Sequence, residues 1–300
     1  MRPKSAMLFA AACLCTSGCG DASKNSEIGV SRFAEEGDGS VNSWILEDAD
    51  NIVVIDAQRS LSAGADLAAD IAARGKPLRA ILLTHPHPDH FGGLQAVLDR
   101  FPGTPVISSP ETLRIMEADE NGFIAMTKEA LGDDAPSVQP LPTQTVGDGE
   151  TVTWGEISLM ADERGRGEAD TMTVFVDPDA GRLFIGDVAD NAMTPFLMEG
   201  HTAAWLEQLV SMQADYGDSD FIVFPGHGPR GDTSMFKETE ELVGWVRGAV
   251  GERLDDGVTE AEVTQIVRAY QERYPNRPAV AAVPQLMREN VRAVAEELDQ

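Results

Sequence analysis

The sequence predicts an α/β protein, and three observations support that class. Short runs of β-branched and aromatic residues alternate with helical patterns along the whole body of the chain. Such interleaving is typical of layered proteins in which helices cover the faces of sheets. The 300 residues are 42% hydrophobic and 24% charged, which is the composition of an ordinary globular protein. No fixed-period repeat or linker interrupts the body, so we expect one large domain.

The first half of the body begins with a predicted hairpin. The elements expected there are strands at 43–46 and 51–55, a helix at 61–74, a strand at 80–83, a helix at 93–100 and a strand at 105–108. Leu67 and Ile71 lie four residues apart on one helical face, and Gly75 supplies a helix stop. Pro102 ends the second helix in the same way.

The second half continues the alternation and ends in helices. The elements expected there are strands at 152–154, 157–160, 171–176 and 182–185, a helix from Thr202 to about 214, a strand at 221–224 and helices from 234 to 300. Apolar spacings of three and four residues in the last segment indicate helices packed on a core. Pro275, Pro278 and Pro284 interrupt that helical pattern.

The first nineteen residues read as a targeting segment. Arg2 and Lys4 precede an apolar run at 6–12, and small residues lead to Cys19. The segment 16–19 resembles the lipobox of bacterial lipoproteins, with Thr16 where a large aliphatic residue is usual. We therefore expect export as a lipoprotein, with soluble periplasmic or secreted protein as the alternative. Residues 20–40 are predicted to be a polar tether, and residues 41–300, including the helices of 234–300, the functional domain.

Charge and cysteine content exclude several classes of function. The chain carries 50 Asp and Glu against 23 Lys and Arg, a net charge of -27, which disfavours nucleic acid as a partner. Membrane contact is expected only through the lipid anchor. All three cysteines lie in the first nineteen residues, so disulfide scaffolds and cysteine nucleophiles are excluded from the body. The expected partner is a small-molecule substrate, and the sequence indicates no oligomeric state.

A histidine-rich motif follows the buried strand at 80–83. Three of the five histidines and one aspartate fall within six residues, as His85, His87, Asp89 and His90. Side chains alternate along an extended backbone, so His85 and His87 are predicted to reach one cation from a rigid strand end. Where the chain turns, Asp89 and His90 can face a second cation. A histidine-rich surface loop is the alternative interpretation.

This motif, H-x-H-x-D-H, resembles the metallo-β-lactamase superfamily. Gly186-Asp187 after a strand matches the family's metal-bridging aspartate, and Pro225-Gly226-His227-Gly228 matches its last histidine ligand. The segment 51–56 resembles the early strand whose final aspartate supports the metal loop. The resemblance spans about residues 40–230. It implies a four-layer αβ/βα sandwich, here with extra C-terminal helices, and a metal site at one edge between the sheets.

One position departs from the family pattern. The family places a histidine before Ser or Thr ahead of the strand at 171–176, whereas this chain has Asp170 before Thr171. A carboxylate can ligate zinc or a harder ion, so Asp170 is the first candidate for this position and Glu168 the next. A first site that neither residue completes is the alternative. His201 reads more simply as part of a helix start than as a substitute ligand.

The resemblance implies a ligand set and a mechanism. The first metal would be held by His85, His87, Asp170 and Asp187, and the second by Asp89, His90, His227 and Asp187. Two divalent ions are expected, zinc first, with iron or manganese as alternatives. In the family a metal-bridging hydroxide attacks the substrate, and Asp89 is the predicted catalytic residue that orients it and passes on a proton.

Fold membership does not select a substrate. Family β-lactamases usually carry cysteine or serine where this chain has Asp187, the nuclease branches need basic segments, and no flavodoxin-like partner domain is present. The sequence therefore predicts a hydrolase of a small-molecule ester, lactone or thioester, with no ranking among the three. The alternatives are a β-lactam hydrolase, or a degenerate or mononuclear metal-binding envelope lipoprotein without catalysis.

Overall fold

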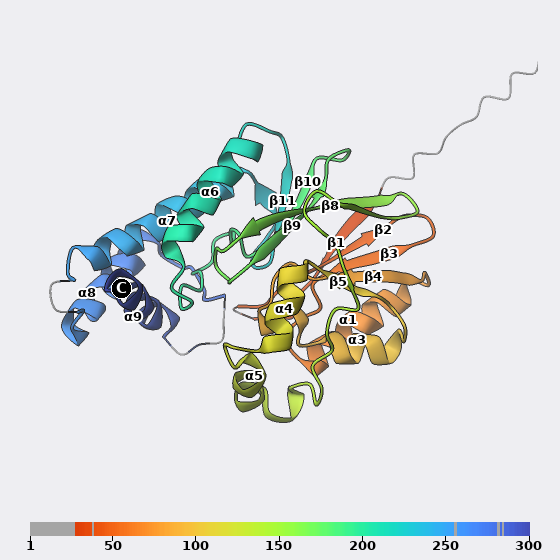
Figure 1. The fold of residues 1–300 in the computed structure, drawn as a ribbon, viewed down its shortest axis with the longest axis horizontal. Coiled ribbons are helices and arrows are strands. Elements are labelled where there is room, and N and C mark those ends of the chain that lie inside the picture. The colour runs from red at the N-terminus through yellow and green to blue at the C-terminus, as the bar shows by residue number, and fades with distance from the viewer. Residues whose placement is uncertain (1–27, 38, 255–256, 281–282, 284) are drawn as a thin grey trace, which may run out of the picture.

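The computed structural model describes residues 28–37, 39–254, 257–280, 283 and 285–300, which form two packed six-stranded sheets with helices outside them (Figure 1). The predicted leader and Cys19 fall in residues 1–27 and so lie outside the described residues. Within the described ranges, no helix combines the length and apolarity that a membrane crossing requires. Export and lipid anchoring stay predictions.

The first sheet is built by the N-terminal half of the chain. Its strands, in spatial and chain order, are β1 (Gly29–Phe33), β2 (Ser43–Glu47), β3 (Ile52–Ile55), β4 (Leu78–Leu82), β5 (Val106–Ser108) and β6 (Gln144–Thr145). β1 to β3 pair antiparallel, and β3 to β6 pair parallel. Parallel neighbours need crossover connections, which here contain α1 (Leu61–Ala73), α2 (Pro88–Phe91), α3 (Leu94–Arg100), α4 (Pro110–Ala118) and α5 (Phe123–Leu131).

The second sheet contains one parallel pair among antiparallel strands. Its spatial order is β12 (Gly231–Asp232), β11 (Ile222–Pro225), β10 (Arg182–Gly186), β9 (Met172–Asp177), β8 (Ile157–Gly165) and β7 (Thr151–Trp154). β10 and β11 run parallel, joined through α6 (Thr202–Tyr216). The carboxyl ends of parallel strands meet at one edge of a sheet, so Asp187 after β10 and His227 after β11 are brought together.

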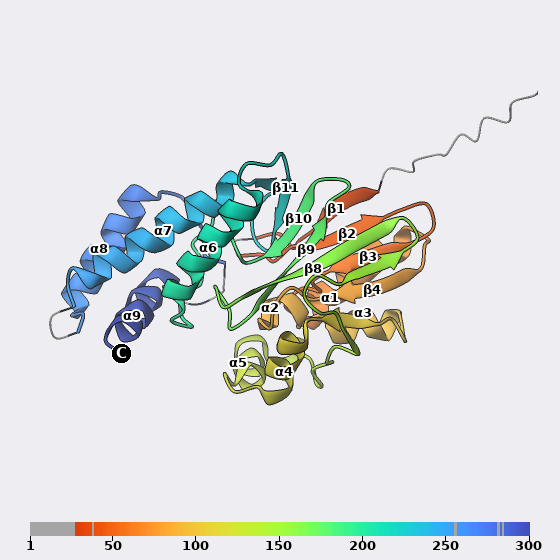
Figure 2. The ribbon, with the colours of Figure 1, turned by 45° about the horizontal axis from the view of Figure 1, so that its top comes forward.

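Alternating side chains create the layers. In β4, Leu82 packs between the sheets, whereas Ile81 packs with residues of α1 and α3 on the outer face. In β9, Phe175 packs between the sheets, whereas Val174 and Val176 face the cluster that includes α6 and α7 (Ser234–Gly251). The order is therefore helix, sheet, sheet, helix, which Figure 2 shows from a second angle. The predicted α/β four-layer sandwich is confirmed.

The C-terminal segment forms separate helices beside the sandwich (Figure 2). They are α7, α8 (Glu260–Arg273) and α9 (Leu286–Leu298), and their apolar faces join the core beneath α6. Thr259 and Glu262 form a capping box, which satisfies two of the backbone N–H groups at the start of α8. Pro275 and Pro278 fall between α8 and α9, where no helix is present in the described residues, and Pro284 lies outside those residues.

Two regions differ from the sequence predictions. Gly29–Phe33, placed in the tether, forms β1 and pairs along its length with β2. The polar surroundings of that strand concealed it, because none of its residues is buried and its side chains Val30 and Phe33 pack only partly against the core. The sequence analysis also assigned no element between the strand at 105–108 and residue 151, where α4, α5 and β6 lie. The folded body therefore begins nearer the N-terminus than predicted, at β1. The second region matters for the site described below, because residues of α5 line its cavity.

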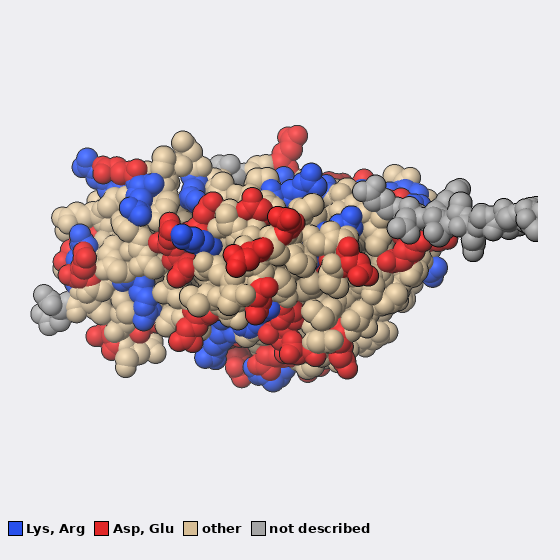
Figure 3. Space-filling view, turned by 90° about the horizontal axis from the view of Figure 1, so that it is seen from above, with Lys and Arg blue, Asp and Glu red and all other residues tan. Residues whose placement is uncertain are grey.

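Acidic and basic side chains are interspersed on the face shown in Figure 3. Such mixing keeps a strongly acidic protein soluble without giving that face a single-sign field. The exclusion of nucleic acid as a partner remains a prediction from composition.

Candidate metal centre

The motif loop is fixed by the elements on either side of it. β4 is buried along most of its length and ends directly before the loop, and α2 starts at Pro88, which suits the first turn of a helix. His85 and His90 are fully buried, and His87 nearly so. The loop can close because Gly93 has no side chain: a Cβ there would lie 2.2 Å from the carbonyl oxygen of Ala57.

Four buried side chains form the first group of ligand atoms. They are His85, His87, Glu168 and Asp187, whose ligand atoms all lie within 4.8 Å of one another. Glu168 Oε2 lies 2.8 Å from His87 Nδ1 and 3.8 Å from His85 Nε2. Three histidine or carboxylate ligands and one more donor match the coordination that zinc takes in proteins.

Asp89, His90 and His227 form the second group. Asp89 Oδ2 lies 3.2 Å from His227 Nε2. Asp187 lies between the groups, since its Oδ2 is 3.3 Å from His90 Nε2, 3.5 Å from His227 Nε2 and 3.9 Å from His85 Nε2. Room for this carboxylate exists because position 226 is glycine, where a Cβ would lie 1.9 Å from Asp187 Oδ1. Asp187 is thus placed to contact cations in both groups.

Each histidine has one ring nitrogen held by a neighbour outside the groups. Nδ1 of His85, His90 and His227 lies 2.8–3.0 Å from Thr84 Oγ1, Asp56 Oδ2 and the Ser40 carbonyl oxygen, respectively. His87 is turned the other way, with Nε2 2.8 Å from Glu199 Oε1 and Nδ1 toward Glu168. Such outer partners fix the tautomer and ring orientation of metal-binding histidines.

The second ring nitrogens of three of these histidines are free to bind a metal ion. Buried atoms without a hydrogen-bond partner in the described part of the chain include Nε2 of His85, His90 and His227, Glu168 Oε2 and Asp187 Oδ1. Leaving several polar atoms unpaired at one buried place costs free energy, and a cation there would satisfy all of them. Together with the donor types, these atoms fit divalent metal ions.

Burial and mutual charge set the proton affinities of the groups. Burial holds the pKa of His85 well below its usual value, so its ring is neutral and Nε2 carries a lone pair. Burial opposes protonation of His90, but Asp187 and Asp56 raise its pKa well above the usual value. Burial also disfavours the charged form of Glu168 and raises its pKa to about 7, although the charge of the nearby His87 acts to lower it. Without metal, protons therefore occupy part of the place that a cation would take, and metal binding would displace them.

The structure does not bring Asp170 to the two motif histidines. Asp170 belongs to a third group with Glu199 and His201, where its Oδ1 lies 3.6 Å from His201 Nε2 and 3.3 Å from Arg166 Nε. Glu168, the second candidate from the sequence, lies in the first group instead. The physical reason is the irregular bend between β8 and β9, which points Glu168 inward and leaves Asp170 half-buried. Of the other predicted residues, His85, His87, Asp89, His90, Asp187 and His227 all lie in the first or second group.

Two further acids near the groups were not predicted from the sequence. Glu199 lies on the loop before α6, and the buried Asp190 lies three residues after Asp187 with both carboxyl oxygens unpaired in the described structure. Burial and the charge of Asp187 raise the pKa of Asp190 well above its usual value. Neither residue follows a strand end directly or belongs to a recognisable motif, so no sequence signal marks it.

The Glu199–His87 contact leads to a prediction about metal affinity. Glu199→Ala removes the acceptor of His87 Nε2 and is expected to weaken metal binding at the first group by about 10–100-fold. Glu199→Gln keeps an acceptor oxygen, so its loss of metal affinity should be smaller. Chelator competition with the purified protein measures the affinity, and exposed Glu207→Ala on α6 is the control. Equal affinities in Glu199→Ala and Glu207→Ala would show that this contact does not position His87.

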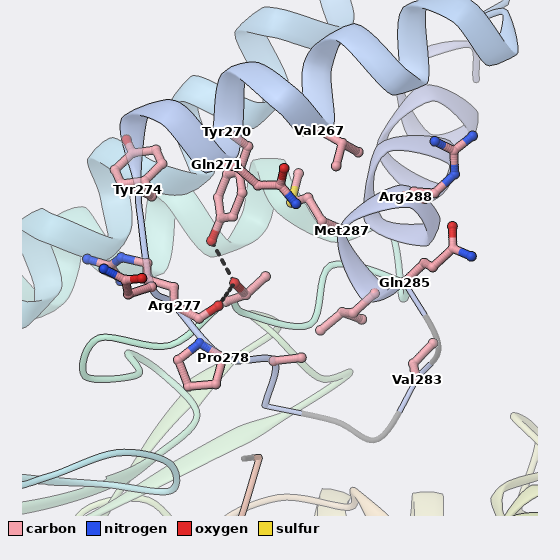
Figure 4. A pocket seen from close by; sticks show the side chains of 14 residues that line it. Val267, Tyr270, Gln271, Tyr274, Arg277, Pro278, Val283, Gln285, Met287 and Arg288 are labelled. Atoms are coloured by element: carbon pink, nitrogen blue, oxygen red, sulfur yellow. Dashed lines mark hydrogen bonds between the residues drawn. The ribbon is translucent and has the colours of Figure 1, made fainter.

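A cavity of about 350 Å³ opens at the two groups, with His87, Asp89, Glu168 and Asp187 in its lining. This volume is at the small end of the range for small-molecule sites. A larger cavity of about 800 Å³ lies beside α8 and α9 (Figure 4). Some of its polar side chains have partners, such as Tyr270 with Thr194 and Arg288 with Glu260. Of these two cavities, it is the smaller that residues of the two groups line.

The fold and the two groups define a class, the αβ/βα sandwich proteins with a histidine–carboxylate metal centre at the edge between their sheets. The family model described as metallo-beta-lactamase superfamily matches residues 37–227, and the chain belongs to that superfamily.

The curated relatives are similar over part of their length. The probable metallo-hydrolase YybB of Bacillus subtilis (strain 168) is 35% identical over 106 residues, which are 35% of this chain and 46% of that protein. The uncharacterized protein YobT of the same organism is 29% identical over 157 residues, which are 49% of this chain and 61% of that protein. The chain thus spans about half the length of the curated relatives it matches, so their whole-protein activities are not transferred.

Among solved structures, a metallo-beta-lactamase from Pontibacter korlensis superposes with a TM-score of 0.57 at 21% identity, covering 73% of this chain and 99% of that one. The DIM-1 metallo-beta-lactamase superposes with a TM-score of 0.57 at 20% identity, covering 74% and 94%. At such identities the likeness shows the fold.

Proposed function

We propose that this protein is a metal-dependent hydrolase of a small-molecule ester, lactone or thioester, with two divalent ions, zinc first among the candidates. The observation that carries the proposal is the convergence of unpaired buried nitrogen and carboxylate atoms from His85, His90, His227, Glu168 and Asp187 at one end of a small cavity. Divalent ions there would lower the pKa of a bound water and polarise a substrate oxygen.

Asp89 is the residue of the chain that we propose to orient the attacking water and to transfer a proton. Asp89 lines the cavity, is partly exposed, and has its carboxylate beside His227 Nε2. Partial burial would raise the pKa of Asp89, but the charges of His90 and His227 hold it well below its usual value. Asp89 is therefore ionised and can accept a hydrogen bond from a water at the two groups and orient it. Passing a proton to a leaving oxygen or sulfur is the second role that we propose for this carboxylate.

The test compares metal content and turnover in the same preparation of the full-length protein. We expect about two metal ions per chain by elemental mass spectrometry, and hydrolysis of some ester, lactone or thioester that a chelator abolishes and added zinc restores. Penicillins and cephalosporins belong in the panel, because β-lactam hydrolysis is the alternative reaction. Retained metal without turnover of any substrate would favour a metal-binding envelope protein, and turnover that survives the chelator would contradict the proposal.

A further inference from the structure

One wall of the cavity at the metal centre is apolar. It is formed by Phe123, Met126, Leu131, Phe196, Val280 and Val283. The first three belong to α5, Phe196 to the loop after β10, and the two valines to the segment between α8 and α9. Three separate parts of the chain therefore surround one apolar space, which we call the α5 pocket.

The α5 pocket begins at a ligand residue. The rings of Phe123 and Phe196 both lie edge-on to the His87 ring, with centroids 5.5 Å away in each case. A substrate whose reacting carbonyl lies at the two groups would therefore place the neighbouring atoms against these apolar side chains.

Helix α5 exposes its apolar side chains in full or in part. None of its residues is buried, although the helix contains Phe123, Ile124, Met126 and Leu131. The α5 residues that line the cavity are linked by spacings of three and four residues, which places them on one side of the helix; they are Phe123, Met126, Thr127, Ala130 and Leu131. Exposed apolar side chains that line a cavity are stabilised when an apolar ligand removes them from water.

We propose that the α5 pocket selects substrates with an apolar acyl substituent. The inference rests on the proposed hydrolase function and narrows its substrate class to esters, lactones or thioesters of medium-length acyl groups. A water molecule occupies about 30 Å³ in the liquid, so 350 Å³ admits roughly ten non-hydrogen atoms besides solvent at the mouth. The occupant is therefore a short chain or a single ring rather than a polymer or a peptide segment.

The test is a series of 4-nitrophenyl esters from acetate to octanoate with the full-length, metal-loaded protein. Burial of one methylene corresponds to about fourfold, so a half-open pocket should raise kcat/KM by about two- to fourfold per added CH₂ until the pocket is full. Met126→Ala should lower the octanoate-to-acetate ratio of kcat/KM by about fivefold or more.

The chain offers a matched control for Met126. Ile124 is on the same helix and equally exposed, at 53% against 52% for Met126, but is outside the cavity lining. Ile124→Ala should leave the octanoate-to-acetate ratio at the wild-type value. A flat chain-length series, or equal ratios in the two variants, would overturn the inference.

A binding measurement separates failure of the pocket from failure of the proposed function. Calorimetry with octanoate and acetate, the product carboxylates, needs no turnover. Tighter binding of octanoate that Met126→Ala weakens and Ile124→Ala does not would support the pocket even if no ester is hydrolysed. Equal binding of the two carboxylates would count against the pocket even if chelator-sensitive hydrolysis is found.

Discussion

Asp187→Ala is expected to remove metal from both groups and to lower hydrolysis by at least about 1,000-fold. The carboxylate lies 3.3–3.9 Å from Nε2 of three histidines that belong to different groups, so its loss affects both sites at once. Removing one member of a buried charged cluster also leaves its partners uncompensated, which penalises cation binding further. Metal content per chain and kcat/KM on any active substrate measure the two effects.

Asp190→Asn is the control for that variant. Asp190 is also buried and only three residues away, but it lies outside both groups, and burial and the charge of Asp187 raise its pKa, which favours the uncharged form. An uncharged amide should therefore replace it with little loss of metal. If Asp187→Ala retained two ions, or if Asp190→Asn lost as much metal as Asp187→Ala, the placement of Asp187 between two cations would be refuted.

Glu168→Gln is expected to lower the metal affinity of the first group by at least about 100-fold. Asp170→Asn should leave that affinity within a few-fold of the wild-type value. Glu168 Oε2 faces His85 and His87, while Asp170 faces His201 and Arg166. Loss of a direct ligand should exceed the 10–100-fold that outer partners typically contribute. Chelator competition of both variants decides between the two carboxylates, and the opposite order would restore Asp170 as the ligand.

The sequence could predict what depends on strand ends and short motifs. His85, His87, Asp89 and His90 follow a buried strand, so the pattern of the motif marked them, and the resemblance to the superfamily added Asp187 and His227, which each follow another strand. Glu168 and Asp170 are two residues apart in a bend without regular periodicity, and no spacing rule says which of them turns inward. Glu199 contacts His87 across 112 positions, a pairing that only the folded chain defines.

Two of the missed elements, β1 and α5, have the same physical origin. β1 has no buried residue, so its sequence carries none of the alternation that marks a half-buried strand. α5 also has no buried residue, and its apolar side chains face a cavity instead of a core. Sequence patterns report burial against the protein itself, so a helix that lines a binding cavity gives a weak signal of its role.

The hydrogen bond from His227 to the Ser40 carbonyl links the metal centre to the N-terminal segment, through which the predicted lipid anchor would hold the protein. The same stretch of backbone holds the last histidine loop again through Asn42, which donates from its backbone N–H to the Gly226 carbonyl and from its side chain to the Pro225 and Gly228 carbonyls. Any attachment at the N-terminus would therefore be joined to the metal centre through β1 and then through residues 40–42. A shortened form that begins after β1 would lose the Arg32 donor to Asn42 Oδ1, whereas only loss of residues 40–42 would remove the contacts on the His227 loop themselves.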